Sequence, residues 1–198
     1  MTTRKEKIAG DLDRQFAEMG FAEQGVEALR AGADVSLRTL YKYFPSREAM
    51  VVGALEHRDK AYFDWLAGGP EGGIGHVLHP IVRLGDWLRE VANTGCLFLN
   101  ALAEHPDSAA IRETVLDHKA RLADEFRIRL QTIAPDKDIE RLAETLFLLH
   151  EGMTQTARLQ GRDRATEAAL RAAKAALAAE GIVPDADLFG EPIISFQS

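Results

Sequence analysis

Apolar residues recur at intervals of three and four along most of this chain, which is the spacing of one face of an α-helix. The first example is Ile8, Leu12 and Phe16, which predicts an amphipathic helix over about 4–19. Ala, Leu, Glu and Arg are abundant and β-branched runs are scarce, a composition that favours helices. No segment has the alternation expected of a strand. The sequence therefore predicts an all-α fold class.

Glycines, prolines and capping residues divide this pattern into about nine helices. Gly20 follows the first helix, Pro45 ends the third, and the run GGPEGG at 68–73 separates the fourth from the fifth. Ser36 and Ser46 are suitable N-caps for the third and fourth helices. The expected helices span about 4–19, 26–32, 37–44, 46–66, 75–92, 95–104, 107–133, 136–160 and 163–180.

The net charge of −7 is distributed unevenly along the chain. Residues 1–60 hold ten Lys or Arg and ten Asp or Glu, whereas residues 61–198 hold fourteen and twenty-one. The whole excess of negative charge therefore lies after the first sixty residues. A neutral N-terminal part is compatible with DNA binding if its cations face one way, but the charge alone does not argue for it.

Several classes of protein find no support in the sequence. No stretch approaches the roughly 18 apolar residues of a membrane span, the start lacks a signal-peptide apolar region, and Cys96 is the single cysteine, so we expect a soluble cytoplasmic protein with no membrane partner. The motifs G-x-S-x-G, G-x-x-x-x-G-K-[ST] and H-E-x-x-H are absent, so we expect no enzyme and no catalytic residue. His76 and His79 lie one turn apart without an evident third ligand, so we expect no metal and no cofactor.

The segment 26–47 predicts two short helices joined by a tight turn, in which Asp34 adopts a left-handed conformation. One face of the third helix carries Leu40 and Phe44, one turn apart, and these fit inward positions. The other face offers cations and hydroxyls, which suit a helix that enters a major groove. A surface helix of a bundle fits the same pattern, so the residues alone leave both interpretations open.

The runs FAEMGF at 16–21 and VSLRTLYKYFPSRE at 35–48 resemble the TetR/AcrR family of bacterial regulators. The DNA-binding domain of that family reads "lF…Gf" followed by "AGVS…tlYyhFpsKe", and the likeness is specific over about 8–55 and weak beyond. The resemblance implies an N-terminal helix-turn-helix domain of three helices over 1–48 and a C-terminal helical domain for ligand sensing and dimerisation over 49–183. Residues 184–198 are expected to form an extended tail.

The resemblance also implies which residues contact double-stranded operator DNA. The recognition helix begins at Ser36, Tyr41 matches a phosphate contact, and Arg47 matches a phosphate-binding lysine at the start of the fourth helix. We expect Arg38 to read a base, guanine through O6 and N7. Packing on the preceding helices is the alternative for Tyr41 and Tyr43. The implied DNA-binding residues are Ser36, Leu37, Arg38, Thr39, Tyr41, Lys42, Tyr43 and Arg47.

Three positions depart from the family pattern. Gly25 stands where a capping Ser or Thr is usual, Arg30 where a small Ala packs, and Asp34 where the turn has glycine. Arg30 must then extend outward, or the helices must sit differently. These departures are the support for an alternative function, a helical ligand-binding or interaction protein with a degenerate DNA-binding head.

The larger domain offers candidates for a dimer interface and a ligand site. Apolar residues over 138–160 and the alanine-rich run 165–179 predict two helices that pair with their symmetry mates, so we expect a homodimer on a pseudo-palindromic operator. Each aromatic residue or histidine taken alone is more often ordinary core, but together they suit a cavity for a small, mostly apolar or aromatic effector that releases a repressor from DNA. Trp65 is a weaker candidate, and Cys96 most simply faces the core. The predicted ligand-binding residues are Trp87, Phe98, His118, Phe126, Phe147 and His150.

Overall fold

The computed structural model describes residues 2–22, 24–91 and 95–183, which form nine helices and no strand. The all-α prediction is confirmed, and the helix bounds agree with the expected ones to within a few residues. The expected tail over 184–198 lies outside the described residues. The helices are α1 (Arg4–Met19), α2 (Val26–Gly32), α3 (Leu37–Tyr43), α4 (Arg47–Leu66), α5 (Gly73–Glu90), α6 (Leu97–Glu104), α7 (Ala109–Ile133), α8 (Glu140–Gln160) and α9 (Arg162–Ala179).

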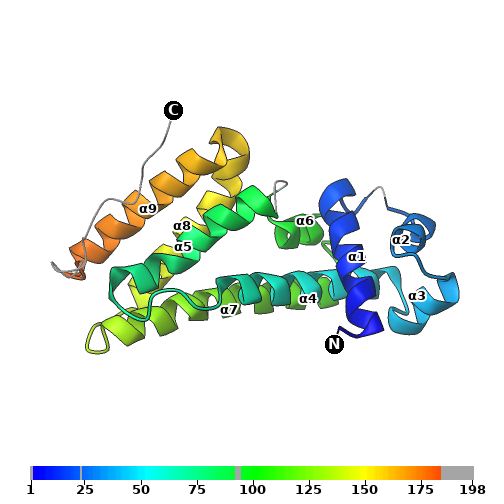
Figure 1. Cartoon of the computed structure of the whole chain (residues 1–198), viewed down its shortest axis with the longest axis horizontal. Coiled ribbons are helices and arrows are strands. Elements are labelled where there is room, and N and C mark those ends of the chain that lie inside the picture. Colours follow the sequence, from blue (N-terminus) through cyan, green and yellow to red (C-terminus); the bar gives the residue numbers. More distant parts are fainter. Residues whose placement is uncertain (1, 23, 92–94, 184–198) are drawn as a thin grey trace.

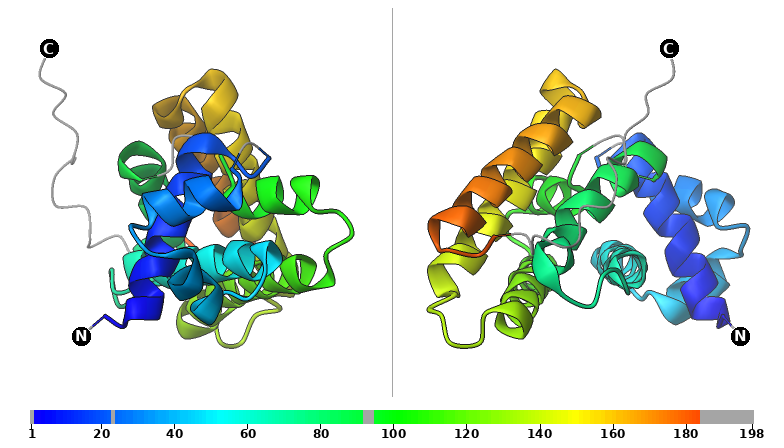
Figure 2. Two further views of the ribbon diagram at one scale, coloured as in Figure 1. Left: turned by 90° about the vertical axis from the view of Figure 1, so that its right-hand side faces the viewer. Right: turned by 60° about the vertical axis from the view of Figure 1, so that its left-hand side comes forward.

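The helices are arranged in two groups along the longest axis of the molecule (Figure 1). The first three helices lie at one end, and we call them the head; α8 and α9 lie side by side at the other end, in the part that we call the body. The long helix α4 joins the groups, because it packs on α1 and on α7. Figure 2 shows α5 between α4 and α9, which agrees with its contacts on both. No helix of the described part is long and apolar enough to cross a membrane.

The buried apolar side chains form two separate cores. One holds the inward faces of the three head helices, continues along α4 as far as Leu55, and takes in α6 and the start of α7 through Ile111 and Val115. The other begins at Tyr62 on α4 and fills the body as far as Ile182. The two cores meet near the middle of α4, which therefore contributes to both.

Several short-range interactions help to fix the head. Thr3 and Glu6 form a capping box at the start of α1, and Ser46 accepts a hydrogen bond from the Ala49 N–H at the start of α4. A Cβ atom at position 53 would collide with the ring of Phe44, so Gly53 allows this ring to lie directly on α4. The ring in turn anchors the end of α3.

Candidate DNA-binding face and effector cavity

The N-terminus of α3 is capped as the sequence predicts. The Ser36 hydroxyl accepts a hydrogen bond from the Thr39 N–H at 3.1 Å and shares a second one with the Thr39 hydroxyl at 2.9 Å. The helix is held to the head by Leu40, which is completely buried, and by Phe44. Its position is thus set by one cap and two apolar side chains.

The outward face of α3 carries most of the predicted DNA-binding residues. Arg38 and Lys42 are exposed, Tyr41 is 44% exposed, and Thr39 and Tyr43 are half-buried. The sequence holds no Asp or Glu between positions 34 and 48, so α3 offers only positive charge. The structure therefore brings together a short positively charged helix with hydroxyl groups beside the cations, which suits contact with phosphates and base edges. The remaining exposed members of the predicted set are Ser36 and Leu37.

Arg47 occupies a different setting from the rest of the predicted set. Its guanidinium donates to the carbonyl oxygens of Phe21 and Gln24, the latter at 2.9 Å, and so ties the connection between α1 and α2 to the start of α4. These partners lie more than twenty positions away in the sequence, and no local signal points to them. The phosphate contact of Arg47 remains a prediction beside this internal role.

The three departures from the family pattern are accommodated by the backbone. Gly25 is the N-cap of α2 and provides no side-chain hydrogen bond. Arg30 extends outward, as expected, where it pairs with Glu27 at 2.9 Å and donates to the Val35 carbonyl. Asp34 has a φ of 51°, which confirms the left-handed conformation predicted for the turn. The helix-turn-helix geometry is therefore kept at all three positions.

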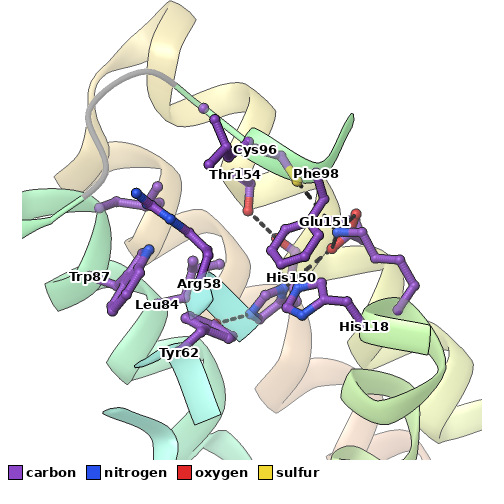
Figure 3. A pocket seen from close by; sticks show the side chains of 14 residues that line it. Arg58, Tyr62, Leu84, Trp87, Cys96, Phe98, His118, His150, Glu151 and Thr154 are labelled. Carbon is purple, nitrogen blue, oxygen red and sulfur yellow. Dashed lines mark hydrogen bonds and ion pairs between the residues drawn. The ribbon is translucent and has the colours of Figure 1, made fainter. Parts of the chain in front are cut away.

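A cavity lies where the two cores meet (Figure 3). It leaves about 50 Å³ for water-sized molecules, which is room for a few waters. In Figure 3 Arg58, Tyr62, Leu84 and Trp87 lie on one side and Phe98, His118 and Glu151 on the other. Five helices contribute to its wall. The lining residues are Arg58, Tyr62, Leu84, Trp87, Leu88, Gly95, Cys96, Leu97, Phe98, His118, Lys119, His150, Glu151 and Thr154.

Four of the six predicted ligand-binding residues line this cavity, namely Trp87, Phe98, His118 and His150. Phe126 is fully buried in the body core and touches the cavity only through the His150 ring, whose centroid is 6.0 Å away. Phe147 is half-buried against the same core and does not line the cavity. Sequence reasoning missed the charged and hydroxyl-bearing members of the lining, because in a sequence such residues look like ordinary surface positions.

The polar groups of the cavity form a chain of contacts. The Tyr62 hydroxyl shares a hydrogen bond of 2.5 Å with His150 Nε2. His150 is 3% exposed, and its Nδ1 has no hydrogen-bond partner among the described residues; a Glu151 carboxylate oxygen lies 3.6 Å away. Lys119 pairs with Glu151 at 2.7 Å and lies 3.5 Å from the Cys96 sulfur. Among these polar groups, the ring nitrogen Nδ1 of His150 is the one left without a hydrogen bond to the described residues.

His118 is fixed by two contacts of different kinds. Its ring stacks on Phe98 with a centroid distance of 3.7 Å, and its Nδ1 donates to the Asp59 carboxylate at 2.8 Å. Burial lowers the pKa of His118 and of His150, so both rings are neutral at pH 7. Burial also raises the pKa of Tyr62 well above its usual value. Burial alone would raise the pKa of Glu151, but His150 and Lys119 lower it to about 2.

The two histidines of α5 lie beside the connection between α4 and α5. His76 Nδ1 lies 2.6 Å from the Pro70 carbonyl oxygen, and His79 is half-buried beside the same connection. In the part of the chain that the structure describes, no three His, Cys, Asp or Glu side chains gather as a metal-binding group.

Solved structures show the same fold. A TetR-family transcriptional regulator from Streptomyces coelicolor, SCO4454, is 24% identical with a TM-score of 0.80, and the match covers 89% of this chain and 95% of that one. The reduced form of NemR from E. coli is 21% identical with a TM-score of 0.72, over 87% and 96% of the two chains. A cysteine mutant of the TetR-family regulator CifR, complexed with double-strand operator DNA, is 24% identical with a TM-score of 0.66, over 87% and 96%. No curated protein matches the chain.

Two family models match the sequence itself. Residues 13–54 match the model of bacterial regulatory proteins of the tetR family, and residues 81–173 match the tetracyclin repressor-like C-terminal domain. Together the two spans cover more than half of the chain, and the first of them includes α2, α3 and the turn between them. The chain therefore belongs to the TetR family, as a transcriptional regulator with a DNA-binding helix-turn-helix.

Proposed function

We propose that this regulator is a repressor that binds a pseudo-palindromic operator as a homodimer and is released when a small molecule occupies the cavity. The observation that carries the proposal is α3, a capped helix anchored by Leu40 and Phe44 that presents Arg38, Tyr41 and Lys42 outward. Such a helix fits the major groove. The protein is expected to act in the cytoplasm, where its operator would be.

The contacts on DNA follow from the positions on α3. Arg38, in the first turn, reads guanine through its paired N–H groups, which supplies sequence specificity. Tyr41 and Lys42, one turn later, bind phosphate and set the register of the helix on the duplex. CifR, a relative with the same fold, has been solved with operator DNA, which supports this mode of binding.

The homodimer would form through the outer faces of α8 and α9. Leu148 is 67% exposed and Leu159 is 84% exposed, and both lie on one stripe of α8. On α9 the exposed stripe consists of small residues, including Ala168, Ala172 and Ala175. Large apolar side chains beside a stripe of alanines allow two copies to pack closely as a four-helix interface.

Repression would be relieved through the cavity. Its wall includes Arg58 and Tyr62 of α4, the helix that also packs on α1 of the head. The cavity has room for only a few waters, so a larger molecule must widen it to bind. This would shift α4 and, with it, change the spacing of the two heads of the dimer.

The test of DNA binding is a selection of genomic fragments by the purified protein, followed by affinity measurements on the enriched site. We expect the wild type to enrich a palindromic motif. Arg38→Ala should relax one position in each half-site and weaken binding by about 1–3 kcal/mol. Arg127→Ala is the matched control, because Arg127 is a partly exposed arginine of α7 that pairs with Asp124 and Glu140 and lies outside both α3 and the proposed dimer interface; it should bind as the wild type does.

Failure to enrich any motif at modest salt would reject DNA-binding repression and favour a ligand-binding protein with a degenerate head. The dimer has its own test, sedimentation at micromolar concentration. A wild-type dimer that Leu148→Glu with Leu159→Glu converts to folded monomer supports the interface, whereas a wild-type monomer contradicts it.

A further inference from the structure

Arg58 lies in the wall of the cavity although it is a buried cation. Its side chain emerges from the middle of α4 and is 7% exposed. The Trp87 ring lies 5.8 Å from its guanidinium carbon, and Tyr62 lies one turn further along the same helix. Figure 3 shows the three residues on the same side of the cavity. A molecule in the cavity would therefore lie close to Arg58.

The counter-charge of Arg58 is outside the cavity, on the head. Its Nε and Nη2 both lie 2.6 Å from Oδ1 of Asp13, a buried residue of α1. The other oxygen of Asp13 lies 3.1 Å from His57 Nδ1, so two consecutive residues of α4 hold one carboxylate of α1. Among the described residues, Nη1 of Arg58 has no hydrogen-bond partner. Arg58 thus binds the head and also belongs to the wall of the cavity.

The charges of the lining favour an anion. Lys119 and Glu151 neutralise each other as an ion pair, and the two histidines of the lining are buried and neutral. Arg58 is the remaining charged group of the lining, and its partner Asp13 is not part of the wall. The lining itself therefore carries one net positive charge, whose counter-charge Asp13 lies outside the wall, among apolar and aromatic side chains.

We infer that the effector carries a carboxylate on a small apolar or aromatic body, and that this carboxylate competes with Asp13 for Arg58. The inference rests on the proposed effector site and names the ligand class and the coupling residue of that site. Once the ligand engages the guanidinium, Asp13 keeps only the His57 contact. The ion pair between α1 and α4 is then lost, and the head can leave the orientation that fits the operator.

The first experiment compares an acid with a neutral molecule of the same shape. Benzoate and benzamide are titrated into the full-length wild-type protein by calorimetry. We expect benzoate to bind about tenfold more tightly, because a hydrogen bond between two charged groups is stronger than one with a neutral partner. Arg58→Lys should keep part of this preference and Arg58→Gln should abolish it. Equal affinities, or no binding of benzoate at its highest usable concentration, overturn the inference.

The second experiment tests the competition with a matched pair of carboxylates on α1. Asp13→Asn releases Arg58, so benzoate should bind this variant several-fold more tightly than the wild type and should no longer weaken DNA binding. Asp11→Asn is the control, because Asp11 is also buried on α1 but pairs with Lys7 and Arg14 of its own helix. Unchanged benzoate affinity in a folded Asp13→Asn variant, or the same change in Asp11→Asn, overturns the competition.

The two experiments separate this inference from the proposed function. A wild type that binds no DNA but prefers benzoate over benzamide refutes the repressor and leaves the carboxylate site standing. A wild type that binds an operator without any preference for the acid refutes only the carboxylate site. Should Arg58→Gln fail to fold because Asp13 is left unpaired, the double variant with Asp13→Asn removes the buried charge and carries the same prediction.

Discussion

The head and the cavity are built in different ways from the same chain. The head is held in part by contacts between residues three or four positions apart, as in the cap of Ser36 on Thr39, and by a small core that α4 completes. The cavity is assembled from five helices, and its central hydrogen bond joins Tyr62 to His150, 88 positions later. Local contacts can be inferred from neighbouring residues, whereas a wall built from distant segments depends on how whole helices pack. The two regions should therefore respond differently to substitution and to pH.

The largest effect is expected in the anchor of α3. Phe44→Ala removes a buried ring from the head core and should lower the free energy of unfolding by about 3–5 kcal/mol. Operator binding should fall with it, because α3 loses its attachment to α4. The measurement is urea unfolding together with DNA affinity.

Phe126→Ala is the matched control in the body core. It should cost a similar free energy of unfolding but leave the affinity of the folded fraction for DNA unchanged. A cost below about 1 kcal/mol for Phe44→Ala would contradict the claim that this ring anchors the end of α3.

The histidines of the cavity should make the folded protein less stable in acid. The folded pKa of His118 and of His150 lies below the usual 6.5, so the unfolded chain binds more protons and stability falls as pH falls below 6.5. Each ring should contribute up to about 1.4 kcal/mol per pH unit. Glu151 acts in the same direction at lower pH, since its stabilisation is present above 4.5 and is lost as pH falls toward about 2.

The contribution of the cavity is isolated by His150→Gln, which keeps a polar side chain that does not titrate. Burial also lowers the pKa of His79 and of His105, so only the difference between wild type and variant reports on His150. The dependence of unfolding free energy on pH should be shallower in the variant between about pH 6.5 and 5. Identical slopes would show that His150 is not held neutral in the folded protein.

Arg47 tests whether a residue of the DNA-binding set also holds the head together. Arg47→Ala leaves the Phe21 and Gln24 carbonyls without this donor, and should lower the free energy of unfolding by about 1–3 kcal/mol in the absence of DNA. Thermal unfolding of the DNA-free protein measures this. If the variant is as stable as the wild type, the internal contacts contribute nothing and phosphate binding is the only role left for Arg47.

The smallest effect is expected at the turn. Asp34→Gly relieves a left-handed backbone that side chains disfavour, and should stabilise the head by about 0.5–1 kcal/mol. It also removes a negative charge near α3, so operator affinity should rise slightly. Ala31→Gly, an exposed position inside α2, is the control and should destabilise instead. A loss of stability in Asp34→Gly would mean that the aspartate side chain itself stabilises the turn.

The helices were predictable because their signals are short-range. Ser36, Ser46, Gly20 and the left-handed Asp34 each act within a few residues of their own position, and all four have the predicted role in the structure. The bounds of the helices follow from such residues and from apolar periodicity. The packing of α4 against α1 and α7 could not be predicted in this way, because it depends on shape complementarity between faces far apart in the sequence.

The part of the cavity wall that could be predicted from the sequence is limited to Trp87, Phe98 and the two histidines; the aromatic Tyr62 was not predicted. Trp87, Phe98 and His118 stand out in a sequence because such side chains are often buried or functional. Arg58 and Lys119 do not stand out, since a lone cation on an amphipathic helix is usually a solvated one. Their burial depends on partners on other helices, Asp13 for Arg58 and Glu151 for Lys119, and a sequence without a fold does not specify those pairs.

The uneven charge of the chain has a consequence for the rate at which the protein reaches DNA. The first sixty residues, which include the head at one end of the molecule, are electrically neutral, whereas residues 61–198 carry the whole excess of −7. In the field of a polyanion the body is repelled and the positively charged α3 is attracted, so the approaching molecule experiences a torque that turns its head toward the duplex. A larger fraction of encounters then begins with the head facing the DNA. This orienting effect should weaken as salt shortens the Debye length, which is about 8 Å at physiological ionic strength.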